Sequence, residues 1–152
     1  MKYTLPFQDP LAARIELSGG KGANLALLTQ RGFPVPPGFV VTAQCYRDFI
    51  ASGRDVLRDI GKLSFDNAGQ LRAESQTLRA ALRQLSLPAQ ALEDIRQELA
   101  QFPPGQAFSV RSSSTMEDLA SAAFAGQHET YLNCTGPDFI LERIKELSLI
   151  HI

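Results

Sequence analysis

Residues 17–28 read LSGGKGANLALL, so that three glycines and a lysine stand directly in front of a stretch with helical spacing. Glycine allows a sharp turn and a close approach of the backbone, and a helix begins with unpaired N–H groups and a positive dipole. The arrangement therefore favours an anion site, to which Lys21 would add a full charge. A surface turn with a solvated lysine stays an alternative on these residues alone. We predict a short helix over 22–30, with Leu25 and Leu28 on one face and Gly32 at its C-terminal end.

The composition indicates a folded globular domain, with 44% hydrophobic and 20% charged residues in a chain of 152. A net charge of -1 gives no general attraction to nucleic acid or to a membrane surface, and we expect neither partner. No apolar run is long enough to span a bilayer, and we expect a cytoplasmic protein. Cys45 and Cys134 lie far apart without metal-ligand spacing, which predicts structural thiols and no metal site.

The first half of the chain after the glycine turn reads as one strand and three helices. Prolines forbid helix just before a short strand over 39–41, and Thr42 is placed to begin a helix that carries Tyr46, Phe49 and Ile50. Helices over 66–85 and from about Pro88 are predicted to form a helical hairpin with solvated arginines and glutamates.

The second half changes character. AFSVRSSS (107–114) and HETYLNC (128–134) are β-prone and frame the small, flexible SAAFAGQ stretch (121–127), which predicts two strands joined by a loop. A last helix is predicted to begin near Asp138. We expect its inward face to comprise Phe139, Ile140, Ile144 and Leu147.

A second cluster of polar residues follows the first of these strands. Arg111 stands at the predicted strand end, four hydroxyl residues occupy 112–115, and Phe-Ala-Gly-Gln follows at 124–127. A guanidinium fork, adaptable hydroxyls and bare glycine N–H groups are the donors that a polyphosphate requires. A serine-rich hairpin loop with one exposed arginine remains the alternative reading of this segment.

In order along the chain, GGKGANL, GFPVPPGFVVT, SVRSSSTMEDL and FAGQHETYLN resemble the nucleotide-binding domain of the phosphoenolpyruvate synthase (pyruvate, water dikinase) and pyruvate phosphate dikinase family. The resemblance implies an α+β fold, the first half of an ATP-grasp nucleotide-binding domain, over residues 1–146. It implies that Lys21 and Arg111 hold the phosphates of ATP and that Gly126 and Thr130 contact the nucleotide.

Neighbouring residues receive weaker expectations. Ser112, Ser113 and Gln127 are expected only to lie near the nucleotide. Glu117 and Asp118 could ligate magnesium, although carboxylates at a helix start are the safer interpretation. A Walker A loop is excluded because Gly22, and not Ser or Thr, follows Lys21.

The resemblance implies part of a phosphotransferase that converts ATP, pyruvate and water to AMP, phosphoenolpyruvate and phosphate. Mg²⁺ ligands, pyruvate handling and catalytic residues would then come from parts of the enzyme absent here, and the chain alone would be inactive. A fragment of a rifampin phosphotransferase and a stand-alone nucleotide-binding or interaction module are the alternatives. The last residues, LSLIHI (147–152), match what a sequencing-library transposon adapter would encode, and we expect them to be a non-native tail.

Overall fold

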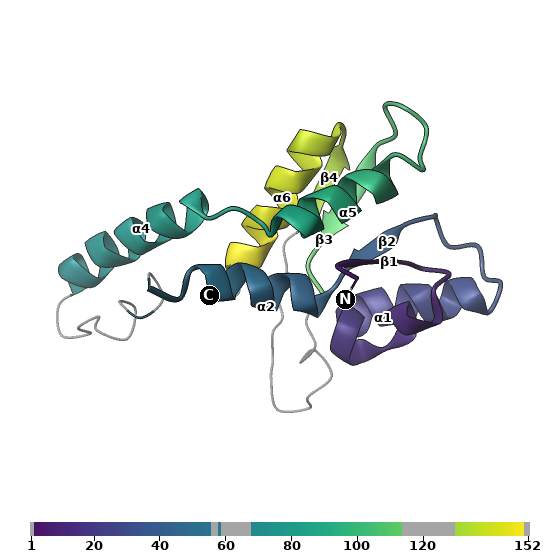
Figure 1. The fold of residues 1–152 in the computed structure, drawn as a ribbon, viewed down its shortest axis with the longest axis horizontal. Helices are drawn as coiled ribbons and strands as arrows, with labels where there is room; N and C mark the ends of the chain where they lie inside the picture. The colour runs from purple at the N-terminus through teal and green to yellow at the C-terminus, as the bar shows by residue number, and fades with distance from the viewer. Residues whose placement is uncertain (1, 56–57, 59–67, 114–129, 151–152) are drawn as a thin grey trace.

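Helices and two separate two-stranded antiparallel sheets make up the structure, a computed structural model that describes residues 2–55, 58, 68–113 and 130–150 (Figure 1). This arrangement confirms the predicted α+β class. The elements, labelled as in Figure 1, are β1 (Thr4–Pro6), the 3-10 helix η1 (Pro10–Ala13), α1 (Ile15–Gln30), β2 (Phe39–Val41), α2 (Ala43–Ser52), α4 (Ala68–Gln84), α5 (Ala89–Leu99), β3 (Phe108–Arg111), β4 (Thr130–Cys134) and α6 (Pro137–Ile150).

The strand predicted over 39–41 is confirmed as β2, and its partner is β1. The two strands pair antiparallel, with Leu5 opposite Val40. We did not predict β1, because three residues that include a proline carry almost no strand signal. Thr42 precedes α2 as predicted, but its hydroxyl donates to the Lys2 carbonyl oxygen at 3.4 Å and does not cap the helix.

Helix α1 is longer than predicted and is interrupted inside the glycine turn. It spans Ile15–Gln30, and Gly19 within it has non-helical angles, φ 66° and ψ 172°. Gly32 adopts φ 80°, and the Phe33 N–H donates to the Leu28 carbonyl oxygen at 3.0 Å. The glycine therefore closes the helix as predicted.

The buried face of α1 differs from the predicted one. Leu28 is 39% exposed, whereas the helix buries its small residues, Ser18, Gly19, Gly20, Gly22, Ala23 and Ala26. Close packing on β2 explains this, since a Cβ on Gly22 would lie 3.2 Å from a methyl carbon of Val40. Leucines in these positions would hold the helix away from the strand.

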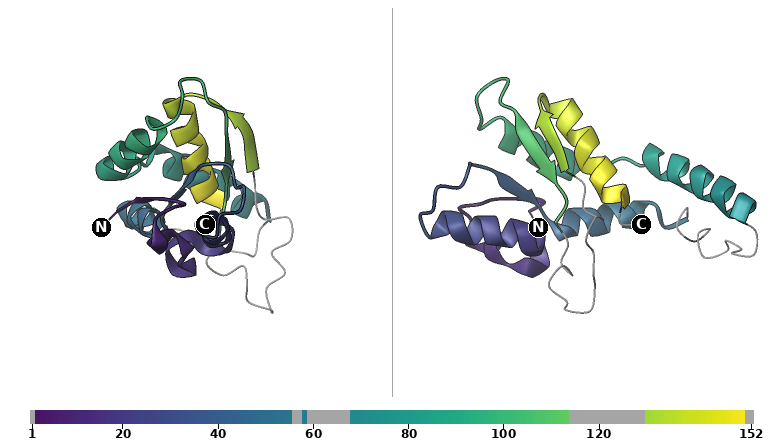
Figure 2. Two further views of the ribbon diagram at one scale, coloured as in Figure 1. Left: turned by 90° about the vertical axis from the view of Figure 1, so that its right-hand side faces the viewer. Right: turned by 180° about the vertical axis from the view of Figure 1, so that it is seen from behind.

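Both helices of the predicted hairpin exist, but the hairpin itself is wrong. Helix α4 extends away from α5 and does not fold back on it (Figures 1 and 2), and it contacts α6. The connection between them contains Leu87, which is buried, followed by Pro88. A residue before proline favours extended backbone, and the burial of Leu87 anchors this connection in the core.

Strands β3 and β4 are confirmed and pair antiparallel, and α6 packs against them (Figure 2). On α6, Ile140 and Leu147 are buried as predicted, but Phe139 is 45% exposed and Leu141 is buried in its place. Positions 140, 141, 144 and 147 share one helix face, which excludes 139. Phe139 instead lies beneath the Arg143 guanidinium, 4.8 Å from the ring centre.

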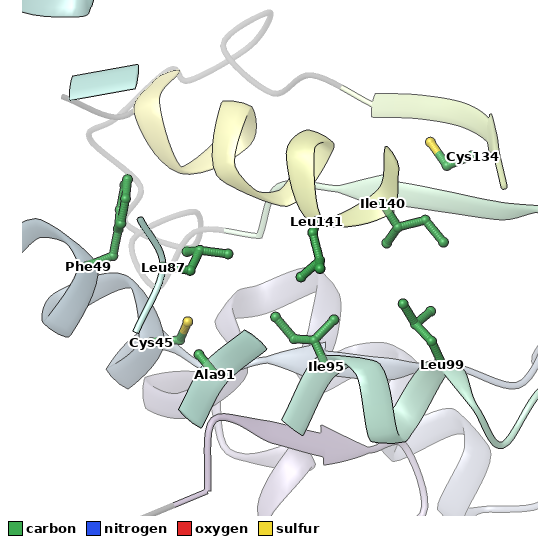
Figure 3. Close-up of a cluster of buried hydrophobic side chains, with 9 residues drawn as sticks. All are labelled: Cys45, Phe49, Leu87, Ala91, Ile95, Leu99, Cys134, Ile140 and Leu141. Carbon is green, nitrogen blue, oxygen red and sulfur yellow. The ribbon is translucent and has the colours of Figure 1, made fainter. Parts of the chain in front are cut away.

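The larger hydrophobic core joins α2, α5, β4 and α6 (Figure 3). Ile140 and Leu141 of α6 point toward Ile95 and Leu99 of α5 in that view. Cys45 and Cys134 are free thiols buried in this cluster, where they pack among its apolar side chains.

Two further predictions concern the membrane and the C-terminus. Among the described helices, none is both long and apolar enough to cross a bilayer. Helix α6 continues to Ile150, and Leu147 is 5% exposed. The origin of residues 147–152 stays a prediction.

Candidate functional site

The lysine of the glycine turn sits where α1 resumes after its interruption. Gly19 adopts backbone angles that residues with a Cβ rarely take, and the chain re-enters the helix directly before Lys21. Lys21 is half-buried, and the glycines on either side of it are buried. The local sequence thus turns the backbone sharply and leaves the lysine as the one long side chain of the turn.

The arginine of the second cluster lies at the end of β3. Arg111 is exposed and stands directly opposite Thr130, the first residue of β4, in the antiparallel register. Ser112, which follows, is buried. Two of the four residues predicted to bind ATP are therefore cross-strand neighbours, which places their Cβ atoms about 4.5–5.5 Å apart.

The glycine turn and the end of β3 touch, although they are 91 residues apart in sequence. The Gly22 N–H donates to the Ser113 hydroxyl at 3.1 Å, and Lys21 Nζ donates to the Ser112 carbonyl oxygen at 3.4 Å. The structure thus brings Lys21 close to the segment that directly follows Arg111.

The close approach that the glycines permit is made by the chain itself. A Cβ on Gly19 would lie 2.4 Å from the Ser113 hydroxyl oxygen and 2.7 Å from the Ser113 carbonyl oxygen. One N–H group that we expected to be unpaired at the helix start, that of Gly22, is already donated to Ser113. The Gly22 N–H, one of the donors that we expected to face an anion, is therefore used within the chain.

Several predicted residues lie outside the described part of the chain. They are Gly126 and Gln127 in the glycine loop, and Glu117 and Asp118 after the hydroxyl run. The described members of the predicted site are Lys21, Arg111, Ser112, Ser113 and Thr130.

Sequence reasoning missed the parts played by Gly19 and Ser113 in joining the two clusters. The signal for Gly19 was present, since it is one of the paired glycines before the lysine. No signal in the sequence could identify Ser113 among four consecutive hydroxyl residues. Nearby, the Ser18 hydroxyl is buried and has no hydrogen-bond partner among the described residues.

An open depression of about 460 Å³ lies elsewhere, between β1 and α5, and shares no residue with these clusters. Three carboxylates line it, and each has a partner within the chain. Asp94 accepts from the Tyr3 N–H, Glu98 accepts from the Thr4 hydroxyl, and Asp9 pairs with Lys2. We therefore assign these carboxylates a structural role.

The described residues contain no group of three or more His, Cys, Asp or Glu side chains that could hold a metal ion. In nucleotide sites Mg²⁺ is usually bound by one or two carboxylates together with substrate phosphates and water.

Comparison with known families defines the class of protein that this fold and these clusters belong to. Residues 15–148 match the family model described as the AMP/ATP-binding domain of pyruvate phosphate dikinase. The match includes the glycine turn and the end of β3, and the chain belongs to this family.

Curated relatives include phosphoenolpyruvate synthases and rifampicin phosphotransferases. The chain is 34% identical, over 91% of its length, to phosphoenolpyruvate synthase of Pyrococcus furiosus. It is 36% identical to the rifampicin phosphotransferases of Streptomyces sviceus and Bacillus subtilis, over 94% and 88% of its length. The chain spans only 22%, 17% and 16% of these three relatives, respectively.

Proposed function

We propose that the chain is the first half of an ATP-grasp domain and supplies part of the phosphate-binding surface of a phosphoenolpyruvate synthase-like dikinase. The observation that carries the proposal is the contact between the glycine turn and the end of β3, which brings Lys21 close to the segment that directly follows Arg111. The family description, an AMP/ATP-binding domain, supports ATP as the ligand. In phosphoryl transfer the protein chiefly positions the phosphates and neutralises their charge, and two cations from separate elements suit that task.

Each site residue has a proposed part. Lys21 and Arg111 contact phosphate oxygens, with the arginine able to bind two oxygens at once. Thr130 lies opposite Arg111 and supplies a hydroxyl donor beside it. Gly126 contributes backbone contact to the nucleotide. Mg²⁺ would arrive with ATP, held by residues outside this chain, and no step is assigned to it here.

For the whole enzyme we propose conversion of ATP, pyruvate and water to AMP, phosphoenolpyruvate and phosphate, and we expect this chain alone to be inactive. A rifampicin phosphotransferase is the second candidate, because relatives of that name match at equal or higher identity. Incubating the complete gene product with ATP and either pyruvate or rifampicin separates the two. Phosphorylation of neither, with ATP still bound, would favour a nucleotide-binding module.

The site assignment is tested with Lys21→Ala and Arg111→Ala in the complete gene product. Each should lower kcat/KM for ATP-dependent phosphorylation, and the corresponding activation free energy should rise by on the order of 2 to 4 kcal/mol, the cost of removing one charge-stabilising donor. Lys2→Ala and Arg47→Ala serve as matched controls, since both side chains are exposed and lie outside the two clusters. Near-normal turnover in both site variants would refute the assignment.

A further inference from the structure

Ser113 makes contacts that join the glycine turn, which carries Lys21, to the end of β3, which carries Arg111. Its hydroxyl oxygen accepts the Gly22 N–H at 3.1 Å, across 91 residues of sequence. Its backbone and hydroxyl also fill the space that the missing Cβ of Gly19 leaves, where an added carbon would lie 2.4 to 2.7 Å from Ser113 atoms. Ser113 is thus seated in the break of α1.

These contacts bear directly on the spacing of the two cations. Gly22 follows Lys21 in the chain, and Ser113 stands two residues after Arg111. A hydrogen bond between Gly22 and Ser113 therefore restrains the backbone beside both cationic side chains. The Lys21 Nζ contact with the Ser112 carbonyl oxygen, at 3.4 Å, adds a second restraint in the same place.

We infer that Ser113 is a positioning residue for ATP binding, whose hydroxyl fixes the glycine turn against the end of β3 and so sets the separation of Lys21 and Arg111. This inference rests on the proposed function. It assigns Ser113 no contact with the nucleotide and rests only on the hydrogen bond that its hydroxyl accepts from Gly22. A polyphosphate requires both cations at a fixed separation. Loss of this contact should therefore weaken the binding of ATP more than the binding of a ligand without phosphates.

The competing explanation is that Ser113 only stabilises the start of the helix, as a side chain that accepts a helix N–H does. In that case its removal would lower stability but would leave the preference for phosphate unchanged. The two explanations predict different changes in the affinities for ATP and for adenosine when Ser113 is substituted.

The test measures the dissociation constants of ATP and of adenosine by isothermal titration on the complete gene product. Ser113→Ala should raise the dissociation constant of ATP about twofold to twelvefold, equivalent to one lost hydrogen bond of ordinary strength, and leave that of adenosine unchanged. Ser109→Ala is the matched control, because Ser109 is an exposed serine on β3, the strand that ends two residues before Ser113. Lys21→Ala is titrated in parallel as a reference for direct loss of a phosphate contact.

The outcomes separate the inference from the proposed function. If the unaltered protein binds no ATP, the proposed function fails and the inference fails with it. The second case is that the unaltered protein binds ATP, that Lys21→Ala weakens this binding, and that Ser113→Ala leaves it unchanged. The inference alone is then overturned. Equal losses for ATP and adenosine in Ser113→Ala would also overturn it, in favour of the structural explanation. Should Ser113→Ala be insoluble, Ser113→Cys, which keeps a side-chain atom in place but accepts hydrogen bonds only weakly, is judged by the same criteria.

Discussion

The larger core and the α1 region, which comprises α1 and the loop that leads to β2 (residues 15–38), differ in the size of the side chains that they bury. The core joins α2, α5, β4 and α6 through large side chains such as Phe49 and Ile95, both fully buried. The α1 region packs through residues that have little or no side chain, including Gly19, Gly22 and Ala26. Both regions bury apolar side chains, but the buried residues of α1 are all small, which permits its close approach to the cluster that contains Leu5 and Val40.

The exposed residues reveal the same contrast. In the α1 region the large apolar side chains of Leu27, Leu28 and Phe33 remain at the surface. The position of the turn that carries Lys21 therefore depends on the small size of the residues that α1 buries. A site built this way depends on glycine positions, while the core beside it depends on volume.

The largest effect that separates the two regions is expected from Phe49→Ala. Phe49 is 0% exposed, and its truncation should cost about 3–5 kcal/mol of unfolding free energy through lost burial and a cavity. Phe33→Ala is the matched substitution in the α1 region, where the ring is 57% exposed, and it should cost no more than about 0.5 kcal/mol. Urea denaturation of both variants measures the difference. Equal costs would show that the cluster in Figure 3 is not the main source of stability.

A smaller effect is expected from adding one carbon to the α1 region. Gly19→Ala must place a Cβ at positive φ and against Ser113, and should cost about 2–4 kcal/mol from backbone strain and overpacking together. Gly32→Ala is the control, because Gly32 also has positive φ but no atom within 4 Å of an added Cβ. It should cost only about 1–2 kcal/mol, the strain alone.

Urea denaturation measures the loss of unfolding free energy in each glycine variant. The loss in Gly19→Ala minus the loss in Gly32→Ala gives the energetic contribution of the contact with Ser113. If Gly19→Ala and Gly32→Ala destabilise equally, the contact between the glycine turn and Ser113 carries no energetic weight. Glycine in the α1 region would then serve conformation alone.

Local signals made much of the fold predictable. The strand over 39–41 matches β2 residue for residue, and Gly32 closes α1 as its sequence position indicated. These features depend on proline, glycine and apolar residues close together in the chain. The hairpin of α4 and α5 was wrong because helical spacing says nothing of the direction in which a connection leads.

Contacts between distant segments could not be predicted in the same way. Motif resemblance selected Lys21, Arg111 and Thr130, but nothing in the residues themselves announces that Thr130 stands opposite Arg111. Nor does composition distinguish Ser113 from its hydroxyl neighbours, since its part follows from a contact with Gly22 across 91 residues. Such contacts depend on how the elements pack.

The smallest expected effect is a pH dependence confined to the larger core. Burial, assisted by the charges of Asp48 and Asp94, raises the pKa of the Cys45 thiol to about 12. Because the unfolded thiol ionises more readily, the stability that Cys45 contributes is complete below about pH 8.5 and is lost as the pH rises toward the folded pKa.

The unfolding free energy of the unaltered protein minus that of Cys45→Ala should therefore be constant near neutral pH. Above about pH 9 this difference should decrease, by at most about 1.4 kcal/mol per pH unit. Urea denaturation in reducing buffer across this range measures it, and a difference that stays flat up to about pH 10 would show that the folded thiol ionises as easily as the unfolded one.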